Sequence, residues 1–538
     1  MSEFDYIVVG AGSAGCVLAA RLAEHSPSNR VLLIEAGGTD NSQMLRKPGM
    51  IALIHQIDQL KAKVDWGYRT VPQKHMNNRR IPYTRGKVLG GCSAVNGLLY
   101  LRGHRANYDE WASLGCEGWS YDDVLPYFKR HERHQDGPNE YHGGDGEIHV
   151  TRHPEDQISP VSKAFAQSVA NYFGIEADGD FNGAEQFTAG FYQMTGANGV
   201  RHSTSERFIR GKNLPNLTVV LNAHTKRVVI ENGRATGVEV IENGQSKIYR
   251  AAAEVILSAG AIGSPQILML SGIGPADHLR YHGIDVQVDL PGVGDNLHDH
   301  LFVPISFRSK YSLGKGTAGH FIKGILKEYL FGNSWFSRTV FEAGAFVKTN
   351  PDEPIPNLQL HSLPLGYPDP NQDGPGRPYI DTGRCLTMLV TLIYPKSRGT
   401  LRLASSDPMA APLIDPNYFA DPADKQLLID GLRLVREIVK KDPVAGMVEQ
   451  ELQPTTRYQT DEELEEQVRL RATTVYHPVG TCKMGVDELA VTDPQLRVRG
   501  VEGLRVADAS IMPTITGGNT NAPSIMIGER AAGWILGT

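Results

Sequence analysis

Residues 4–15 read Phe4-Asp5-Tyr6-Ile7-Val8-Val9-Gly10-Ala11-Gly12-Ser13-Ala14-Gly15, a largely apolar run that passes directly into glycines spaced as GxGxxG. A helix-like stretch follows over residues 16–22, and Val31-Leu32-Leu33-Ile34-Glu35 comes next as a second apolar run that ends in an acid. A strand, a glycine turn, a helix and an acid-terminated strand make up the βαβ unit that binds dinucleotides. The sequence therefore predicts a dinucleotide cofactor at the first βα turn.

The residues of this unit have separate physical tasks. Gly10 permits the tight turn out of the strand, Gly12 lets the backbone approach a pyrophosphate, and Gly15 lets the helix pack against the sheet. The helix N-terminus offers free N–H groups to the phosphates. Glu35 is expected to hydrogen-bond ribose hydroxyls and would repel a 2′-phosphate, which argues against an NADP-type ligand. The unit alone leaves NAD and FAD open.

Composition is that of an ordinary soluble globular protein. The 538 residues suffice for two substantial domains, sequential or interleaved. Hydrophobic residues make up 41% and charged residues 21%, and a net charge of −6 without a basic cluster argues against nucleic acid as a partner. The cysteines are scattered without a CxxC pair, so we expect free thiols rather than disulfides or a zinc site; they are Cys16, Cys92, Cys116, Cys385 and Cys482.

Signals for secretion and membrane insertion are missing from the sequence. The start, Met1-Ser2-Glu3-Phe4-Asp5, is acidic, whereas a secretory signal has a positive start and an apolar core. No stretch approaches the ~18 uninterrupted apolar residues of a membrane span. We therefore expect a cytoplasmic protein and leave peripheral membrane contact open.

Strand-like and helix-like patterns outline the rest of the chain. β-Branched runs at 217–221, 227–230 and 236–241 precede Val255-Ile256-Leu257-Ser258, which predicts a small β-meander that feeds back into a buried parallel strand. The region from about residue 311 to 470, with a helical period at 425–439, is expected to face the substrate. Near the end, Leu504-Arg505-Val506-Ala507-Asp508 reads as a strand ending in an acid, and Ser524–Leu536 as a helix packed on the first domain.

Five motifs resemble signatures of the glucose–methanol–choline (GMC) oxidoreductases. They are Gly86–Asn96 (GKVLGGCSAVN), Gly260–Gly274 (GAIGSPQILMLSGIG), Tyr476–Gly485 (YHPVGTCKMG), Val506–Pro513 (VADASIMP) and Asn519–Pro523 (NTNAP). With the opening βαβ unit they reach from residue 5 to about 535, so the resemblance covers essentially the whole chain. Within the family the chain is most similar to bacterial alcohol, choline and L-sorbose dehydrogenases.

The resemblance implies an α/β fold that is α+β when the whole chain is considered. In this fold a Rossmann-like FAD-binding domain is interleaved with a substrate domain built on an antiparallel sheet with helices. The FAD-binding domain is expected at residues 1–157, 200–310 and 468–538, and the substrate-binding domain at 158–199 and 311–467. Val95 stands where certain members carry a histidine bonded to the flavin, so the resemblance implies FAD held non-covalently.

Matching the family motifs residue by residue also gives a set of expected site residues. Those expected to bind FAD are Gly10, Gly12, Ser13, Gly15, Glu35, Ala36, Arg85, Gly90, Gly91, Ser93, Asn96, Gly97, Val228, Ala259, Gly260, Asp508, Ala509, Asn519 and Thr520. Asp508 is also suited to cap a helix. His477 matches the catalytic histidine that takes the hydroxyl proton, and Asn519 the position that hydrogen-bonds the substrate oxygen.

Further side chains are candidates for contact with the substrate. Tyr476, Glu342 and Trp335 are the first of these, although a buried structural role is favoured for Tyr476. Trp66, Tyr68 and Phe336 either line an entrance or pack in the core. His298-Asp299-His300 superficially resembles a metal cluster, but adjacent residues of one short loop without a further partner favour a structural loop near the flavin, and no metal is expected.

The resemblance implies oxidation of a primary alcohol to the aldehyde by hydride transfer to flavin N5, with electrons passed to a quinone or another acceptor that is not NAD. Three related alternatives stay open, namely an oxidase that uses oxygen, a choline dehydrogenase and a sugar or polyol dehydrogenase. Two others differ in class, a hydroxynitrile lyase that retains FAD and a non-catalytic flavin-binding protein. The oligomeric state is not indicated.

Overall fold

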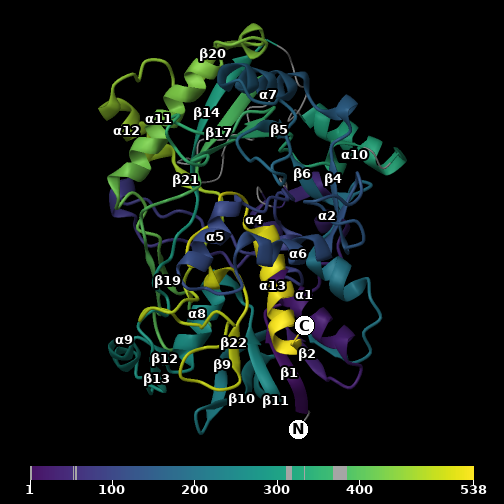
Figure 1. The fold of residues 1–538 in the computed structure, drawn as a ribbon, viewed down its shortest axis with the longest axis vertical. Helices are drawn as coiled ribbons and strands as arrows, with labels where there is room; N and C mark the ends of the chain where they lie inside the picture. Colours follow the sequence, from purple (N-terminus) through teal and green to yellow (C-terminus); the bar gives the residue numbers. More distant parts are fainter. Residues whose placement is uncertain are drawn as a thin grey trace.

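Two large sheets form the framework of the protein, one above the other along its long axis (Figure 1). The computed structural model describes residues 3–51, 54, 57–310, 318–331, 334–367 and 384–537. Within this part of the chain, no helix is long and apolar enough to cross a membrane. The mixed α/β architecture predicted from the sequence is confirmed, with one largely parallel and one antiparallel sheet.

The lower sheet carries the predicted βαβ unit. Strand β1 (Glu3–Val9) pairs in parallel with β2 (Val31–Ile34) on one side and with β11 (Gln245–Leu257) on the other. All four residues of β2 are buried, as expected for a parallel strand covered on both faces. Strand β22 (Leu504–Val506) extends the sheet beside β11, which confirms the strand expected there.

The predicted meander is correct except for its first strand. Strands β9 (Ala223–Glu231), β10 (Arg234–Glu242) and β11 are joined as antiparallel neighbours, and the end of β11 continues in parallel beside β1. Strand β8 (Leu217–Val220) instead pairs in parallel with β2 at the far edge of the sheet. Local alternation cannot distinguish these two positions, because a β-branched run fits either neighbour.

The last helix lies against the first, as predicted. Helix α13 (Asn521–Leu536) begins three residues earlier than expected and runs beside α1 (Ser13–His25), the yellow and purple helices of Figure 1. The contact is close, because a Cβ at Gly528 would lie 2.6 Å from the carbonyl oxygen of Ala14. Buried Glu529 accepts hydrogen bonds from Arg21 across the same contact, the shortest at 2.7 Å.

The upper sheet is antiparallel. Its order is β20 (Val448–Gln453), β14 (Leu301–Ser309), β17 (Cys385–Leu392), β16 (Leu358–Leu363), β15 (Ala343–Val347) and β5 (Ala189–Phe191), and β21 (Thr473–Thr474) pairs with the start of β14. Helix α11 (Pro422–Ile438), which contains the predicted helical period, packs closely on β17 through Gly431. Strand β14 belongs to this sheet although it falls in a segment expected in the cofactor domain, and the residue boundaries of the domains stay a prediction.

Shorter elements connect and cover the two sheets. The remaining helices are α2 (Gln43–Arg46), α4 (Asp58–Lys61), α5 (Arg105–Ser113), α6 (Tyr121–His131), α7 (Pro160–Phe173), α8 (Gly260–Leu270), α9 (Ala276–Tyr281), α10 (Ala318–Phe331) and α12 (Asp461–Arg471). The remaining strands are β3 (Glu132–His134), β4 (Ile148–Arg152), β6 (Gln193–Ala197), β7 (Val200–Arg201), β12 (Ile273–Gly274), β13 (Val288–Asp289), β18 (Thr400–Arg402) and β19 (Leu413–Asp415).

A buried charged network lies beside β3. Glu132 pairs with the buried Arg102 at 2.7 Å and with Nδ1 of His142 at 2.9 Å. Nε2 of His142 lies 2.7 Å from Asp180. Burial disfavours the imidazolium, but the hydrogen bonds to Asp180 and Glu132 outweigh burial and raise the pKa of His142.

Candidate active site

The first βα turn has the geometry that its glycines require. Gly10 adopts a φ of +97°, and a Cβ there would lie 2.5 Å from the carbonyl oxygen of Ser258. A Cβ at Gly15 would lie 1.9 Å from the carbonyl oxygen of Gly10. At Gly12, by contrast, the nearest atom to a Cβ is 4.0 Å away, so the space above its Cα is open. The turn is thus tight at its ends and free of protein atoms at the point where a pyrophosphate is expected.

Two helix N-termini meet at this open space. The hydroxyl of Ser13, at the start of α1, donates to Oδ1 of Asn521, at the start of α13, over 2.8 Å. No side chain caps the first turn of either helix. Because the free N–H groups and positive dipole ends of both helices converge here, the residues present fit an anionic group such as a pyrophosphate.

The expected cofactor residues of the Gly86–Asn96 motif lie across the same turn. The N–H of Gly90 donates to the carbonyl of Ala11 over 2.7 Å, and a Cβ at Gly91 would lie 2.7 Å from Cα of Gly12. Ser93 hydrogen-bonds Thr204, whose hydroxyl reaches the Gly12 carbonyl. The segment Gly90–Gly97 therefore forms one wall of the expected FAD site.

Both acids expected near the cofactor are tied to the backbone. Glu35 accepts from the N–H of Ala11 at 3.0 Å and from that of Gly37, beyond Ala36, at 2.8 Å, while burial raises its pKa to about 7. Asp508 accepts from the N–H of Gly260 at 2.9 Å. Asp508 also accepts from the N–H of Ser510 at 2.8 Å, which confirms its capping role at the short turn that contains Ala509. Their contacts with FAD stay predictions.

The contact of Val228 with FAD also stays a prediction. Val228 lies inside β9, and its N–H donates to the hydroxyl of Ser271 over 2.8 Å. Arg85, in contrast, reaches the catalytic motif, because its guanidinium donates to the carbonyl of Tyr476. Tyr476 itself adopts a φ of +66° and is 38% exposed, so the buried position considered for it is wrong.

The two residues expected to be catalytic lie together. Nε2 of His477 is 3.1 Å from Nδ2 of Asn519, and Nδ1 of His477 is 3.0 Å from Nδ1 of His300. Asn519 comes from the loop that precedes α13, beside Thr520, so this pair borders the expected cofactor site. Oδ1 of Asn519 is buried and finds no hydrogen-bond partner among the described residues.

Local electrostatics keep His477 neutral. Loss of hydration lowers the pKa of His477 well below its ordinary value, and positive charge on the neighbouring His300, Arg85 or His361 lowers it further. Its backbone N–H donates to Oδ1 of Asp299 over 2.7 Å, which fixes the main chain at this position. The arrangement thus presents a neutral imidazole next to an amide, the groups needed to accept a proton and orient a hydroxyl.

The side chains of His298, Asp299 and His300 have separate partners. Nδ1 of His298 is 2.6 Å from the carbonyl oxygen of Asn296, whereas His300 contacts His477. Asp299 accepts from the hydroxyl of Tyr418 at 2.7 Å and from that of Thr474. Among the residues that the structure describes, no group of three or more His, Cys, Asp or Glu side chains is placed to hold a metal ion.

Most of the side chains considered for contact with the substrate have structural partners instead. Oε2 of Glu342 accepts from the N–H and hydroxyl of Ser159 at 3.0 and 2.6 Å and from the hydroxyl of Ser162 at 2.9 Å, so it stabilises the first turn of α7. Tyr68 and Phe336 are buried, which favours core packing, and Trp66 stacks on Tyr68. The side chain of Trp335 lies outside the described residues.

One buried cation at this site, Arg201, was not predicted from the sequence. Arg201, 1% exposed, donates to the carbonyls of Leu45, Ser93 and Asn96 and to Oδ1 of Asn96 over 2.7–3.2 Å. These bonds hold the Gly90–Gly97 wall from behind. No motif surrounds Arg201, so no local signal could have identified it.

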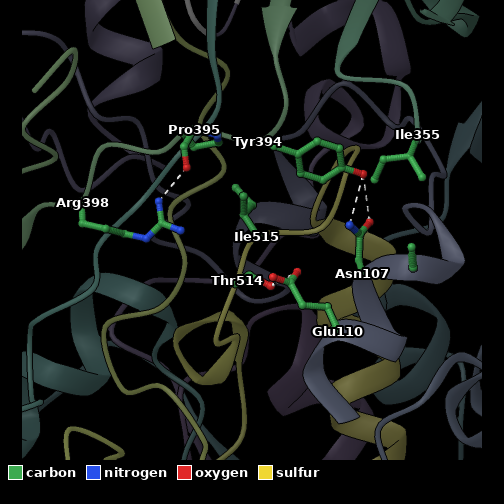
Figure 2. A pocket seen from close by; sticks show the side chains of 9 residues that line it. Asn107, Glu110, Ile355, Tyr394, Pro395, Arg398, Thr514 and Ile515 are labelled. Atoms are coloured by element: carbon green, nitrogen blue, oxygen red, sulfur yellow. Dashed lines mark hydrogen bonds between the residues drawn. The ribbon is translucent and has the colours of Figure 1, made fainter. Parts of the chain in front are cut away.

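A cavity of about 350 Å³ lies next to the site but outside it (Figure 2). The hydroxyl of Tyr394 hydrogen-bonds Asn107 on one side, and Arg398 donates to the carbonyl of Pro395 on the other. Tyr394 directly follows Ile393, whose carbonyl lies 2.9 Å from Nε2 of His300. None of the expected catalytic or cofactor residues lines this cavity.

Comparison with known proteins agrees with this geometry. Sequence profiles of the GMC oxidoreductases match residues 4–302 and 395–528. An alcohol dehydrogenase [acceptor] of Pseudomonas putida is 42% identical over 98% of this chain and 95% of its own length. An oxygen-dependent choline dehydrogenase of Sinorhizobium fredii is 42% identical over 99% and 96%. Among solved structures, a formate oxidase variant from Aspergillus oryzae RIB40, studied for FAD modification, superposes with a TM-score of 0.88 at 29% identity over 100% and 98% of the two chains.

Proposed function

The chain belongs to the GMC oxidoreductase family and uses FAD to act on alcohol-type donors, and from this premise we propose that it oxidises a primary alcohol to the aldehyde. The alcohol loses its hydroxyl proton and a hydride from the adjacent carbon. When bound, FAD would supply the hydride acceptor, N5, and would pass the electrons to a quinone or another acceptor that is not NAD. The observation that carries the proposal is the contact of Nε2 of His477 with the amide of Asn519 at 3.1 Å.

His477 and Asn519 share the handling of the substrate hydroxyl. The amide N–H of Asn519 donates to the substrate oxygen, while Nε2 of His477 takes the proton from that oxygen. A neutral imidazole is required for this step, and the lowered pKa of His477 keeps that form at physiological pH. General-base catalysis of this kind contributes roughly 10²–10⁴-fold in rate.

The substrate and the acceptor follow from weaker support. The Pseudomonas putida relative, named for an alcohol and an acceptor, supports a dehydrogenase. Choline is the second candidate, supported by the Sinorhizobium fredii relative. A cationic donor needs an anionic partner, and Oε2 of Glu342 already accepts three hydrogen bonds at the start of α7. A neutral primary alcohol is therefore favoured. The acceptor, any contact with a membrane and the non-covalent attachment of FAD belong to the same proposal.

The test is the visible spectrum of the purified holoenzyme, recorded without oxygen before and after primary alcohols, choline and polyols are added in turn. Loss of the flavin absorbance with a primary alcohol supports the proposal, whereas loss with choline or a polyol alone assigns the enzyme to that donor. Admission of air then separates an oxidase, which recovers its colour at once, from a dehydrogenase. A flavin that stays oxidised with every alcohol contradicts the proposal and favours lyase chemistry.

A further inference from the structure

His300 lies in a row between a backbone carbonyl and the expected catalytic base. Its Nε2 is 2.9 Å from the carbonyl oxygen of Ile393, and its Nδ1 is 3.0 Å from Nδ1 of His477. The His300 side chain is fully buried, and the two imidazole rings stand at 89° to each other. The contact thus runs from nitrogen to nitrogen rather than face to face.

The register of the upper sheet creates this row. Leu301 of β14 pairs with Leu392 at the end of β17, so His300 and Ile393 are the residues that come next beyond this pair on the two antiparallel strands. On the other edge of β14, Leu301 pairs with Thr474 of β21, and the N–H of Val475 donates to the carbonyl of His300 over 3.2 Å. Three strand ends therefore bring Ile393, His300 and His477 together.

Hydrogen-bond chemistry fixes the protons along the row. Two backbone carbonyls, those of Ile393 and Thr516, face the His300 ring. A carbonyl oxygen only accepts, so the 2.9 Å contact of Nε2 with Ile393 places a proton on Nε2 of His300. Burial lowers the pKa of His300 to about 3, and its neutral imidazole therefore has a lone pair on Nδ1. The contact between the two Nδ1 atoms is a hydrogen bond only when His477 donates. A neutral His477 with a proton on Nδ1 then has its lone pair on Nε2.

The other end of the row agrees independently. Nε2 of His477 lies 3.1 Å from Nδ2 of Asn519, which only donates, so this contact also requires a lone pair on Nε2. Other titratable groups surround the pair without competing for Nδ1 of His477. Asp299 accepts the backbone N–H of His477, and Arg85 donates to the carbonyl of Tyr476. Nδ1 of His361 pairs with the hydroxyl of Tyr192 and Nδ1 of His298 with a carbonyl.

We propose that His300 is a positioning residue that holds His477 in the tautomer protonated on Nδ1, so that Nε2 is free to take the proton of the substrate hydroxyl. This inference rests on the proposed role of His477. When Nε2 takes that proton, His477 becomes an imidazolium whose Nδ1–H still donates to His300. The lone pair on His300 therefore stabilises the charge that develops during the reaction, without any proton moving onto His300.

The experiment compares His300→Phe with His300→Asn in the holoenzyme. Phenylalanine fills the space of the imidazole without an acceptor, whereas the side-chain oxygen of asparagine restores one near Nδ1. We expect the rate of flavin reduction by alcohol to fall about 10- to 10²-fold in His300→Phe, from a lost hydrogen bond and a misplaced proton. His300→Asn should recover most of that loss. His131→Phe is the matched control, since His131 is fully buried and bonded to Tyr100 at 3.1 Å.

A pH profile separates positioning from structural support. Loss of the acceptor destabilises the imidazolium of His477 more than the neutral ring, so the acid limb of the rate should move to lower pH in His300→Phe. Unchanged reduction and an unmoved limb, with flavin content retained, overturn the proposal. A wild-type flavin that no alcohol reduces contradicts the proposed function itself. Normal reduction in His477→Ala removes His477 from the mechanism, and with it the role of His300. A slow His477→Ala beside a normal His300→Phe refutes only the role of His300.

A direct measurement covers the case in which His300→Phe does not fold. Long-range ¹H–¹⁵N spectra of the wild-type holoenzyme labelled with ¹⁵N-histidine, with His477→Gln for assignment, report which ring nitrogen carries the proton. We expect Nδ1 of His477 to be protonated and Nε2 to be unprotonated. The reverse pattern overturns the proposal.

Discussion

Replacement of Arg201 by methionine should weaken FAD binding, although Arg201 itself is not expected to contact the cofactor. The guanidinium donates four hydrogen bonds, to the carbonyls of Leu45, Ser93 and Asn96 and to Oδ1 of Asn96. Three of these four acceptors belong to Ser93 and Asn96, which are expected to bind FAD. Methionine has similar length but no donors, so the wall from Gly90 to Gly97 loses its support from behind.

The magnitude is set by two opposing contributions. Hydrogen bonds from a charged donor contribute about 1.5–3 kcal/mol each, so four of them give roughly 6–12 kcal/mol. Burial of the charge opposes this and lowers the pKa of Arg201 to about 9, equivalent to about 5 kcal/mol. Because methionine removes the buried charge as well as the bonds, we expect a net loss of roughly 1–7 kcal/mol. Expressed wholly in cofactor binding, a loss of about 3 kcal/mol within that range is a roughly hundredfold weaker affinity.

The assay is the release of flavin from the holoenzyme, followed by fluorescence during dilution, together with the melting temperature with and without excess FAD. Arg133→Met is the matched control, because Arg133 is exposed and its one hydrogen bond, to Asp145, is 3.4 Å long. Arg201→Lys should bind FAD no better than Arg201→Met, since an ammonium cannot reproduce the planar set of donors. Wild-type affinity and melting temperature in Arg201→Met would refute the reasoning.

Three further outcomes are expected. His477→Ala should retain its flavin, but the reduction of that flavin by alcohol should slow about 10²–10⁴-fold in stopped-flow experiments. The exposed control His25→Ala should keep the wild-type rate. An unchanged rate in His477→Ala would remove His477 from the mechanism. Gly12→Val should fold, since the nearest protein atom to a Cβ at this position is 4.0 Å away. It should lack flavin absorbance, because the valine side chain occupies the expected pyrophosphate position. Full flavin content would contradict that position. The raised pKa of His142 contributes stability that is complete below the unfolded pKa of 6.5 and is lost as pH rises through the higher folded pKa. The melting temperature should therefore fall over that pH interval more in the wild type than in His142→Gln. Parallel plots of melting temperature against pH for the two proteins would contradict this account.

The parts of the fold that could be predicted have local causes. Gly10 and Gly15 mark the first turn because contacts of 2.5 Å or less exclude any Cβ there, a restriction visible in the glycine spacing itself. The periodic apolar residues of α11 and α13 likewise predict helices. Strand β8 was misplaced because its neighbour, β2, lies far away in the sequence, and an apolar run does not specify its partner.

At the candidate site, too, some features could be predicted from the sequence and others are visible only in the structure. Motif resemblance supplied His477 and Asn519, but not the 3.1 Å contact between them. His300 was visible only as part of a histidine-rich loop, because its task depends on strands that pair Leu301 with Leu392. Arg201 is one of many arginines in the sequence, and it is distinguished by its buried hydrogen bonds to Ser93 and Asn96, which only the structure shows.

The contact between α1 and α13 has a consequence for how the protein is made. Gly10 is translated long before Asn519 and Thr520. At about 5–20 residues per second, roughly 25–100 s of synthesis separate the two halves of the expected FAD site. We therefore expect flavin to be bound only after Thr520 has been made, and a chain that stops before residue 519 should never acquire colour however well its first βαβ unit has folded.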